Sequence, residues 1–150
     1  MTDRTSAGPA VPAAFKAIFA MGEAMKKAAA DAGLDPRLPE LIKIRASQMN
    51  ACAFCLDMHT RDAAEMGEDP RRLNMLAAWR ETELYSEQER VALEITEVLT
   101  DLASTRDLSD DLYRRATEVF TDQQFAAIVW AVTVINAWNR LNVASRTPLP

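Results

Sequence analysis

The sequence predicts an all-α protein of six to seven helices, and three observations lead to this prediction. Apolar residues recur at helical spacing along almost the whole chain, as they do on one face of an amphipathic helix. No segment of four to eight residues alternates between apolar and polar side chains as a β-strand does. The chain has only 4 glycines in 150 residues, which argues against a turn-rich β-sandwich.

The composition indicates an ordinary globular protein, with 49% hydrophobic and 26% charged residues. A net charge of −5 gives no reason to expect a nucleic-acid partner, which would favour a basic surface. The N-terminus lacks the apolar core of a secretory signal, and the longest apolar stretch, from Phe125 to Ile135, is too short to span a bilayer. We therefore expect a cytoplasmic protein with no membrane partner.

The first elements are a tail and two helices. The small and polar residues of 1–11 predict a flexible N-terminal tail, and residues 12–150 predict a single helical domain. An apolar face within residues 15–25 predicts the first helix, which Gly33 ends. Asp35-Pro36 suits a cap and a first turn, so we expect the second helix at about residues 38–49.

The next two helices have similar start and stop signals. Asn50 is expected to cap the third helix, which runs to Met66 and ends at Gly67. Asp69-Pro70 begins a short fourth helix that ends near Trp79.

Two capping boxes mark the C-terminal half. Ser86 to Glu89 opens a helix whose apolar stripe extends to Leu102, and a shorter helix covers residues 109–120. Thr121 to Gln124 opens a long helix that ends near Ala144 and is apolar on most sides, which is typical of a core or a subunit interface. Its narrow polar stripe is interpreted as a partly hydrated seam and comprises Thr133, Asn136 and Arg140.

Residues 52–59 hold both cysteines and the only histidine of the chain. Cys52, Cys55 and His59 are spaced i, i+3, i+7, so on one continuous helix they would share a face. A thiolate is the reactive form of cysteine, and a nearby imidazole helps to generate it. A thiolate that attacks a peroxide becomes a sulfenic acid, which a second thiol condenses with to form a disulfide.

Other interpretations of this motif fit less well. A thioredoxin-like motif needs a βαβ context, and haem attachment needs a histidine where Leu56 stands. A structural zinc site usually has four protein ligands, and the motif offers three, so a zinc-binding module stays an alternative. Two buried thiols without chemistry are a further alternative. The joint spacing favours a dithiol redox site.

The spacing E-x(11)-C-x-x-C-x-x-x-H, from Glu40 to His59, resembles the AhpD alkylhydroperoxidase family of the carboxymuconolactone decarboxylase-like superfamily. Ser47 and Asn50 also fit, the resemblance is strongest over residues 15–105, and residues 136–141 resemble the last helix of single-domain members. The resemblance implies an AhpD-like helical fold, antioxidant hydroperoxide reductase activity and a homotrimer or homohexamer.

The resemblance also implies residue roles. Cys55 would be the peroxidatic thiol, Cys52 the resolving thiol, and His59 with Glu40 a proton relay that activates Cys55. The helix dipole instead favours Cys52 as the more readily ionised thiol. Phe54 stands where the best-studied members have a further histidine, so one branch of the relay is missing.

No nucleotide-binding glycine pattern is present, so reducing equivalents should come from a partner thiol. No cofactor and no resident metal are expected. The expected partners are a hydroperoxide substrate and a protein reductant, either a dithiol or a lipoyl or thioredoxin-like protein. The alternatives are thiol-disulfide exchange without peroxide chemistry and a decarboxylase-like lyase of the same superfamily, although that lyase needs no cysteine pair.

Overall fold

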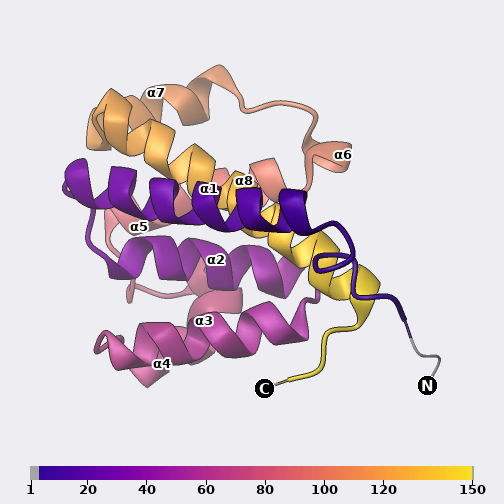
Figure 1. The fold of residues 1–150 in the computed structure, drawn as a ribbon. Helices are drawn as coiled ribbons and strands as arrows, with labels where there is room; N and C mark the ends of the chain where they lie inside the picture. The colour runs from indigo at the N-terminus through magenta and orange to yellow at the C-terminus, as the bar shows by residue number, and fades with distance from the viewer. Residues whose placement is uncertain (1–3, 150) are drawn as a thin grey trace.

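A computed structural model describes residues 4–149 and confirms the all-α fold class, because these residues contain helices and no strand. The chain order of the elements is visible in Figure 1. The helices are α1 (Pro12–Asp31), α2 (Arg37–Met49), α3 (Ala53–Glu65), α4 (Pro70–Met75), the 3-10 helix η1 (Leu76–Glu81), α5 (Glu87–Thr100), α6 (Leu102–Thr105), α7 (Asp110–Val119) and α8 (Asp122–Ser145).

The eight α-helices of the described residues slightly exceed the six to seven expected from the sequence. The predicted helix near residues 70–79 is α4 followed by the tighter η1, with a break in helical geometry at Ala78. Leu102, expected on the stripe of the preceding helix, instead begins α6, because Asp101 leaves helical geometry with φ −111° and ψ 49°. Both differences are interruptions that an apolar stripe does not reveal.

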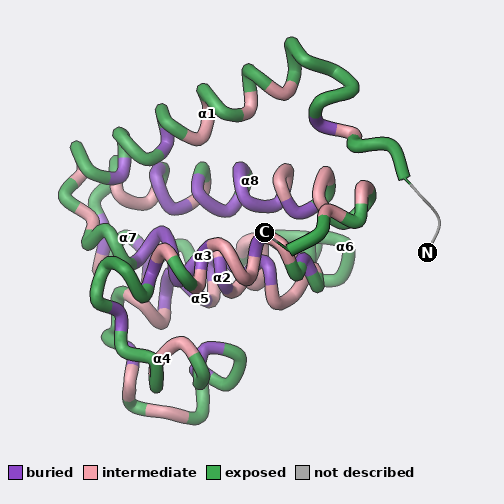
Figure 2. Tube along the Cα trace, turned by 60° about the horizontal axis from the view of Figure 1, so that its bottom comes forward, coloured by how far each residue is buried: buried purple, intermediate pink, exposed green. Residues whose placement is uncertain are grey.

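Helix α8 is the centre of the fold. It packs against α1 on one side and against α2, α3, α5 and α7 on the other, and Figure 2 shows its buried turns between α1 and those helices. A helix with neighbours on both sides must be apolar nearly all round, which explains the sequence pattern of α8. Helix α1 covers the other face of α8, and only Met25 and Ala29 of α1 are buried.

The predicted capping boxes both form. The hydroxyl of Ser86 accepts the backbone N–H of Glu89 while the Glu89 carboxylate accepts the backbone N–H of Ser86. Thr121 and Gln124 make the same reciprocal pair at the start of α8. These bonds satisfy N–H groups that the first turn of a helix leaves without partners.

The N-terminal segment 4–11 lies against the end of α8. The Arg4 guanidinium donates to the Ala144 carbonyl at 3.0 Å, and the Ala7 N–H donates to Ser145 Oγ at 2.9 Å. Residues 1–3 of the predicted tail lie outside the described residues, and the flexibility of the tail stays a prediction. Within residues 4–149, no helix is both long enough and apolar enough to cross a membrane.

Two glycines offer opposite tests of the fold. Gly67 ends α3 with φ +84°, where an L side chain is strained, whereas Gly22 lies inside α1 with no atom within 4 Å of an added Cβ. We expect Gly67→Ala to lower the free energy of unfolding by about 1 kcal/mol. Gly22→Ala should raise it by up to about 1 kcal/mol, because alanine favours a helix interior. Urea unfolding measures both changes. If the two substitutions changed the free energy of unfolding in the same direction, the assigned backbone geometry would be contradicted.

Candidate active site

A sharp turn between α2 and α3 positions the cysteine pair. Asn50 ends α2, Ala51 adopts the left-handed conformation with φ 52°, and Cys52 is the N-cap of α3. The prediction that Asn50 caps this helix is therefore wrong, because the left-handed residue separates Asn50 from it. Cys52 precedes the helix, so only Cys55 and His59 of the motif lie on one helical face.

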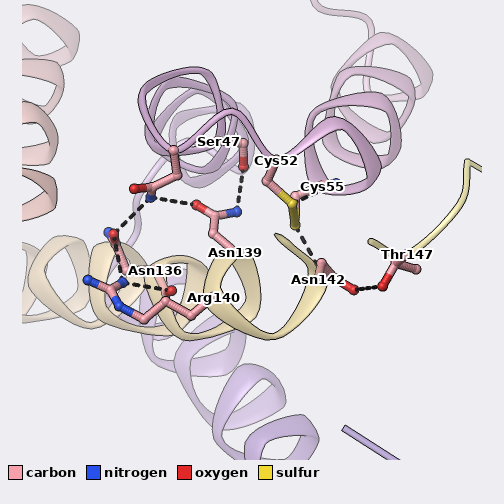
Figure 3. The surroundings of a disulfide bond; sticks show 9 residues. Ser47, Cys52, Cys55, Asn136, Asn139, Arg140, Asn142 and Thr147 are labelled. Atoms are coloured by element: carbon pink, nitrogen blue, oxygen red, sulfur yellow. Dashed lines mark hydrogen bonds between the residues drawn. A yellow bond between two sulfur atoms is a disulfide. The ribbon is translucent and has the colours of Figure 1, made fainter. Parts of the chain in front are cut away.

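The two sulfur atoms lie at disulfide distance from each other, with Cα atoms 5.4 Å apart, and Figure 3 shows the bond between them. Both cysteines are buried, and the backbone N–H of Cys55 donates to Cys52 Sγ at 3.4 Å. The turn itself is fixed by the bond from the Cys52 N–H to the Ser47 carbonyl at 3.0 Å. This geometry fits a dithiol that is reversibly oxidised.

The structure pairs His59 with Glu40, which lies on the neighbouring α2. His59 Nδ1 is 2.8 Å from Glu40 Oε2, and both side chains are buried. Lys43 Nζ donates to the other carboxylate oxygen at 2.6 Å, and Asp62 Oδ2 lies 3.6 Å from His59 Nδ1. A carboxylate on Nδ1 orients the imidazole and fixes the tautomer whose Nε2 has the free lone pair.

Glu40 is charged at neutral pH although only 5% of its surface is exposed. Burial raises the pKa of this carboxyl group, but the hydrogen bond with His59 and the charge of Lys43 outweigh burial and hold the pKa below its ordinary value of 4.5. The pair is therefore a buried carboxylate beside an imidazole, as a proton relay requires.

A pocket of about 710 Å³ lies between α1, α2, α3 and α8, next to the cysteine and histidine side chains. Cys55, His59 and Glu40 line it, whereas Cys52 does not. Its wall is largely apolar, and Phe54 belongs to it. The aromatic part of the wall includes Phe15, Phe19 and Trp138, whose rings meet edge to face with centroids 4.8–5.7 Å apart. Phe19 is 54% exposed, so the pocket has an open apolar mouth.

A network of amides lies beside the cysteines and was not identified as part of the site from the sequence. Asn50 Nδ2 donates to the side-chain oxygens of Asn136 and Asn139, each at 2.9 Å, and Asn139 Nδ2 donates to Ser47 Oγ at 3.0 Å. Arg140 adds a bond to Asn136 Oδ1 at 3.2 Å. Of the predicted stripe on α8, Thr133 and Arg140 are exposed and Asn136 is buried, so the stripe is partly hydrated and its buried residue joins this network (Figure 3).

A signal for this network was available in the sequence. Asparagines at 136, 139 and 142 recur every three residues on an otherwise apolar helix. A buried amide without partners costs about 1–3 kcal/mol, so such a run indicates polar neighbours from another element.

Within residues 4–149, one group of side chains could hold a metal ion, because their ligand atoms lie within 4.8 Å of one another. The group consists of Glu40, His59 and Asp62. Neither cysteine belongs to this group. A zinc site formed by both cysteines and His59 would require the two sulfurs to separate from each other.

Known proteins resemble the chain in sequence. The model of the carboxymuconolactone decarboxylase family matches residues 12–98. The uncharacterized protein YdfG of Bacillus subtilis is 44% identical over 120 residues, which are 80% of this chain and 81% of YdfG.

Solved structures resemble it in fold. A protein of unknown function from Agrobacterium tumefaciens, a candidate for the antioxidant defence protein AhpD, matches with a TM-score of 0.89 and 36% identity over 99% of both chains. The debrominase Bmp8 matches with a TM-score of 0.82 over 95% of this chain and 74% of Bmp8, at 15% identity. At that identity the likeness to Bmp8 concerns the fold alone.

The charge state of Glu40 predicts a pH effect on stability. Because folding lowers the pKa of Glu40, its contribution to stability is present above the ordinary value of 4.5 and is lost as the pH falls. The free energy of unfolding of the wild type should exceed that of Glu40→Gln by more at about pH 7 than at about pH 4. Urea unfolding at both pH values checks this, and a gap that widens in acid would contradict it.

Proposed function

Because the chain belongs to the carboxymuconolactone decarboxylase family and has its AhpD-like fold, we propose that it reduces hydroperoxides with Cys52 and Cys55 as the redox pair. A solved structure that is 36% identical is a candidate for the antioxidant defence protein AhpD, and the cysteine pair at disulfide distance fits a redox role. The observation that carries the proposal is the position of Cys55 on an apolar pocket that the Glu40–His59 pair also lines.

The proposed cycle has two steps on the enzyme. The Cys55 thiolate attacks one oxygen of the hydroperoxide, so an S–O bond forms and the O–O bond breaks. The departing alkoxide takes up the proton that Cys55 gave to His59 and leaves as an alcohol. Cys52 then attacks the sulfenic acid sulfur, so the disulfide forms, the S–O bond breaks, and water leaves. The peroxide gains two electrons and the dithiol loses them.

The pocket supports Cys55 as the attacking thiol. Cys55 lines the pocket and Cys52 does not, so a peroxide in the pocket meets Cys55 first. The N-cap position of Cys52 still gives that sulfur a backbone donor, as the helix dipole predicts. We assign it the resolving role because resolution needs contact with Cys55, which it has, and not with the substrate.

His59 and Glu40 would supply the proton relay. With Nδ1 bonded to Glu40, the free lone pair of His59 is on Nε2, and the ring lines the same pocket as Cys55. In the proposal His59 takes the Cys55 proton and Glu40 stabilises the resulting imidazolium. Lys43, which bonds the other oxygen of Glu40, keeps that carboxylate charged and in place.

An external reductant completes the cycle in this proposal. A dithiol, or a lipoyl or thioredoxin-like protein, would reduce the Cys52–Cys55 disulfide by exchange. A homotrimer or homohexamer and a cytoplasmic location stay predictions. Trp130, 52% exposed on α8, is one large apolar side chain that an assembly would cover.

Peroxide consumption with a dithiol reductant tests the cycle. Cys55→Ser and Cys52→Ser should each abolish turnover, because one removes the nucleophile and the other prevents resolution. His59→Ala should lower kcat/KM by a factor of about 100 to 10,000, as is usual for the loss of a general base.

Asp57→Asn is the matched control on the same helix, since Asp57 faces solvent in an ion pair with Arg61, and it should keep wild-type activity. Full activity in Cys55→Ser would show that the nucleophile is misassigned. A wild type that exchanges disulfides but consumes no peroxide would favour the thiol-disulfide alternative.

The pocket wall predicts a preference for organic hydroperoxides. Phe54 lines the pocket next to Cys55 and offers apolar contact to a bulky substrate. Phe54→Ala should lower kcat/KM for cumene hydroperoxide about tenfold and change the value for hydrogen peroxide much less. Equal losses for the two peroxides would mean that Phe54 supports the fold and not the substrate.

A further inference from the structure

We infer that Asn142 is a catalytic residue that donates a hydrogen bond to the sulfur of Cys55 and promotes its thiolate form, with Thr147 as the residue that positions it. This inference rests on the proposed function, in which Cys55 is the nucleophile. It adds a component from α8 to a site whose other groups come from α2 and α3.

The contact is direct. Asn142 Nδ2 lies 3.4 Å from Cys55 Sγ, across 87 positions of sequence (Figure 3). Both residues line the pocket. Within residues 4–149, no other side chain donates a hydrogen bond to this sulfur. An amide N–H binds an anionic acceptor more strongly than a neutral one, so the contact gains strength when the disulfide is reduced and Cys55 ionises.

The surroundings of Cys55 make such a donor necessary. Cys55 is 1% exposed and packs in an apolar cluster with Ala46, Ile135 and Trp138. An anion in apolar surroundings is costly unless donors compensate for lost hydration. Asn142 supplies compensation on the pocket side of the sulfur, where a peroxide would arrive.

The orientation of the Asn142 amide is fixed by its neighbour. Thr147 Oγ donates to Asn142 Oδ1 at 2.9 Å, and the Thr147 backbone N–H donates to the Asn142 carbonyl at 3.1 Å. Arg146, with φ 49°, ends α8 in the left-handed conformation and turns the chain back so that Thr147 reaches Asn142. With the Thr147 hydroxyl on the amide oxygen, the amide nitrogen lies toward the sulfur.

The same contact distinguishes the two thiols. Cys52 Sγ accepts a backbone N–H at the start of α3, whereas Cys55 Sγ accepts the side chain of Asn142. The helix terminus alone favours ionisation of Cys52, and Asn142 offsets that preference at Cys55. A side-chain donor can be removed by substitution, which makes the inference testable.

The test uses the Cys52→Ser background, in which Cys55 is the single thiol of the chain. The rate of iodoacetamide alkylation is measured against pH for this protein, for its Asn142→Leu variant and for its Thr147→Val variant. Loss of the donor should slow alkylation near neutral pH about tenfold and move the midpoint of the pH profile upward, with a smaller change in the same direction for Thr147→Val.

The pH profile separates the inference from simpler explanations. A change in access to Cys55 would lower the rate at every pH and leave the midpoint in place, so unshifted midpoints in both variants would overturn the inference. Asn74→Leu, at an exposed position of α4, is the matched control and should not move the profile. Alkylation needs no peroxide, so a failure of the proposed peroxidase activity would appear in the turnover assay and not here.

Discussion

Polar groups buried around the cysteine pair need partners, and this constraint determines how α2, α3 and α8 pack. Within the described residues, no buried side-chain nitrogen or oxygen lacks a hydrogen-bond partner. Glu40 on α2 bonds His59 on α3, and Asn139 on α8 bonds Ser47 on α2. Each bond crosses between helices, so a shift of one helix would leave buried groups unpaired at a cost of about 1–3 kcal/mol each.

The same constraint connects packing to chemistry. The bonds that fix α2 against α3 also set the orientation of the imidazole, and those that fix α8 set the position of its amides. Apolar side chains surround the two cysteines, and the polar groups lie beside them. In the proposed cycle, a buried thiol thus receives help from His59 on its own helix and from Asn142 on α8, while a substrate enters through the pocket.

The sequence predicted the elements better than their junctions. The two capping boxes predicted the starts of α5 and α8, because the signal and its partner lie within four residues. The start of α3 was predicted at the wrong residue. Ala51 adopts the left-handed conformation, which a sequence usually indicates by a glycine, and here the position is an alanine. The side chain of Asn50 does not cap α3 and instead donates hydrogen bonds to Asn136 and Asn139 on α8.

The residues of the candidate site show the same difference between local patterns, which the sequence reveals, and contacts between helices, which it does not. The motif from Cys52 to His59 is local and was found from spacing alone. Glu40 was singled out through the family resemblance, because an isolated glutamate carries no sign that it will be buried beside a histidine. Asn142 was missed, since its contact with Cys55 depends on how α8 crosses the start of α3, which periodicity does not determine.

The central claim is that Cys55 is oxidised by a hydroperoxide and that Cys52 resolves the product. Mass spectrometry after a single turnover tests it most directly. Reduced wild-type protein is mixed with one equivalent of cumene hydroperoxide, and the same is done with Cys52→Ser. The account predicts an intramolecular Cys52–Cys55 disulfide in the wild type and one added oxygen on Cys55 in the variant. Reduced, unmodified cysteines in both proteins, with the peroxide intact, would contradict it.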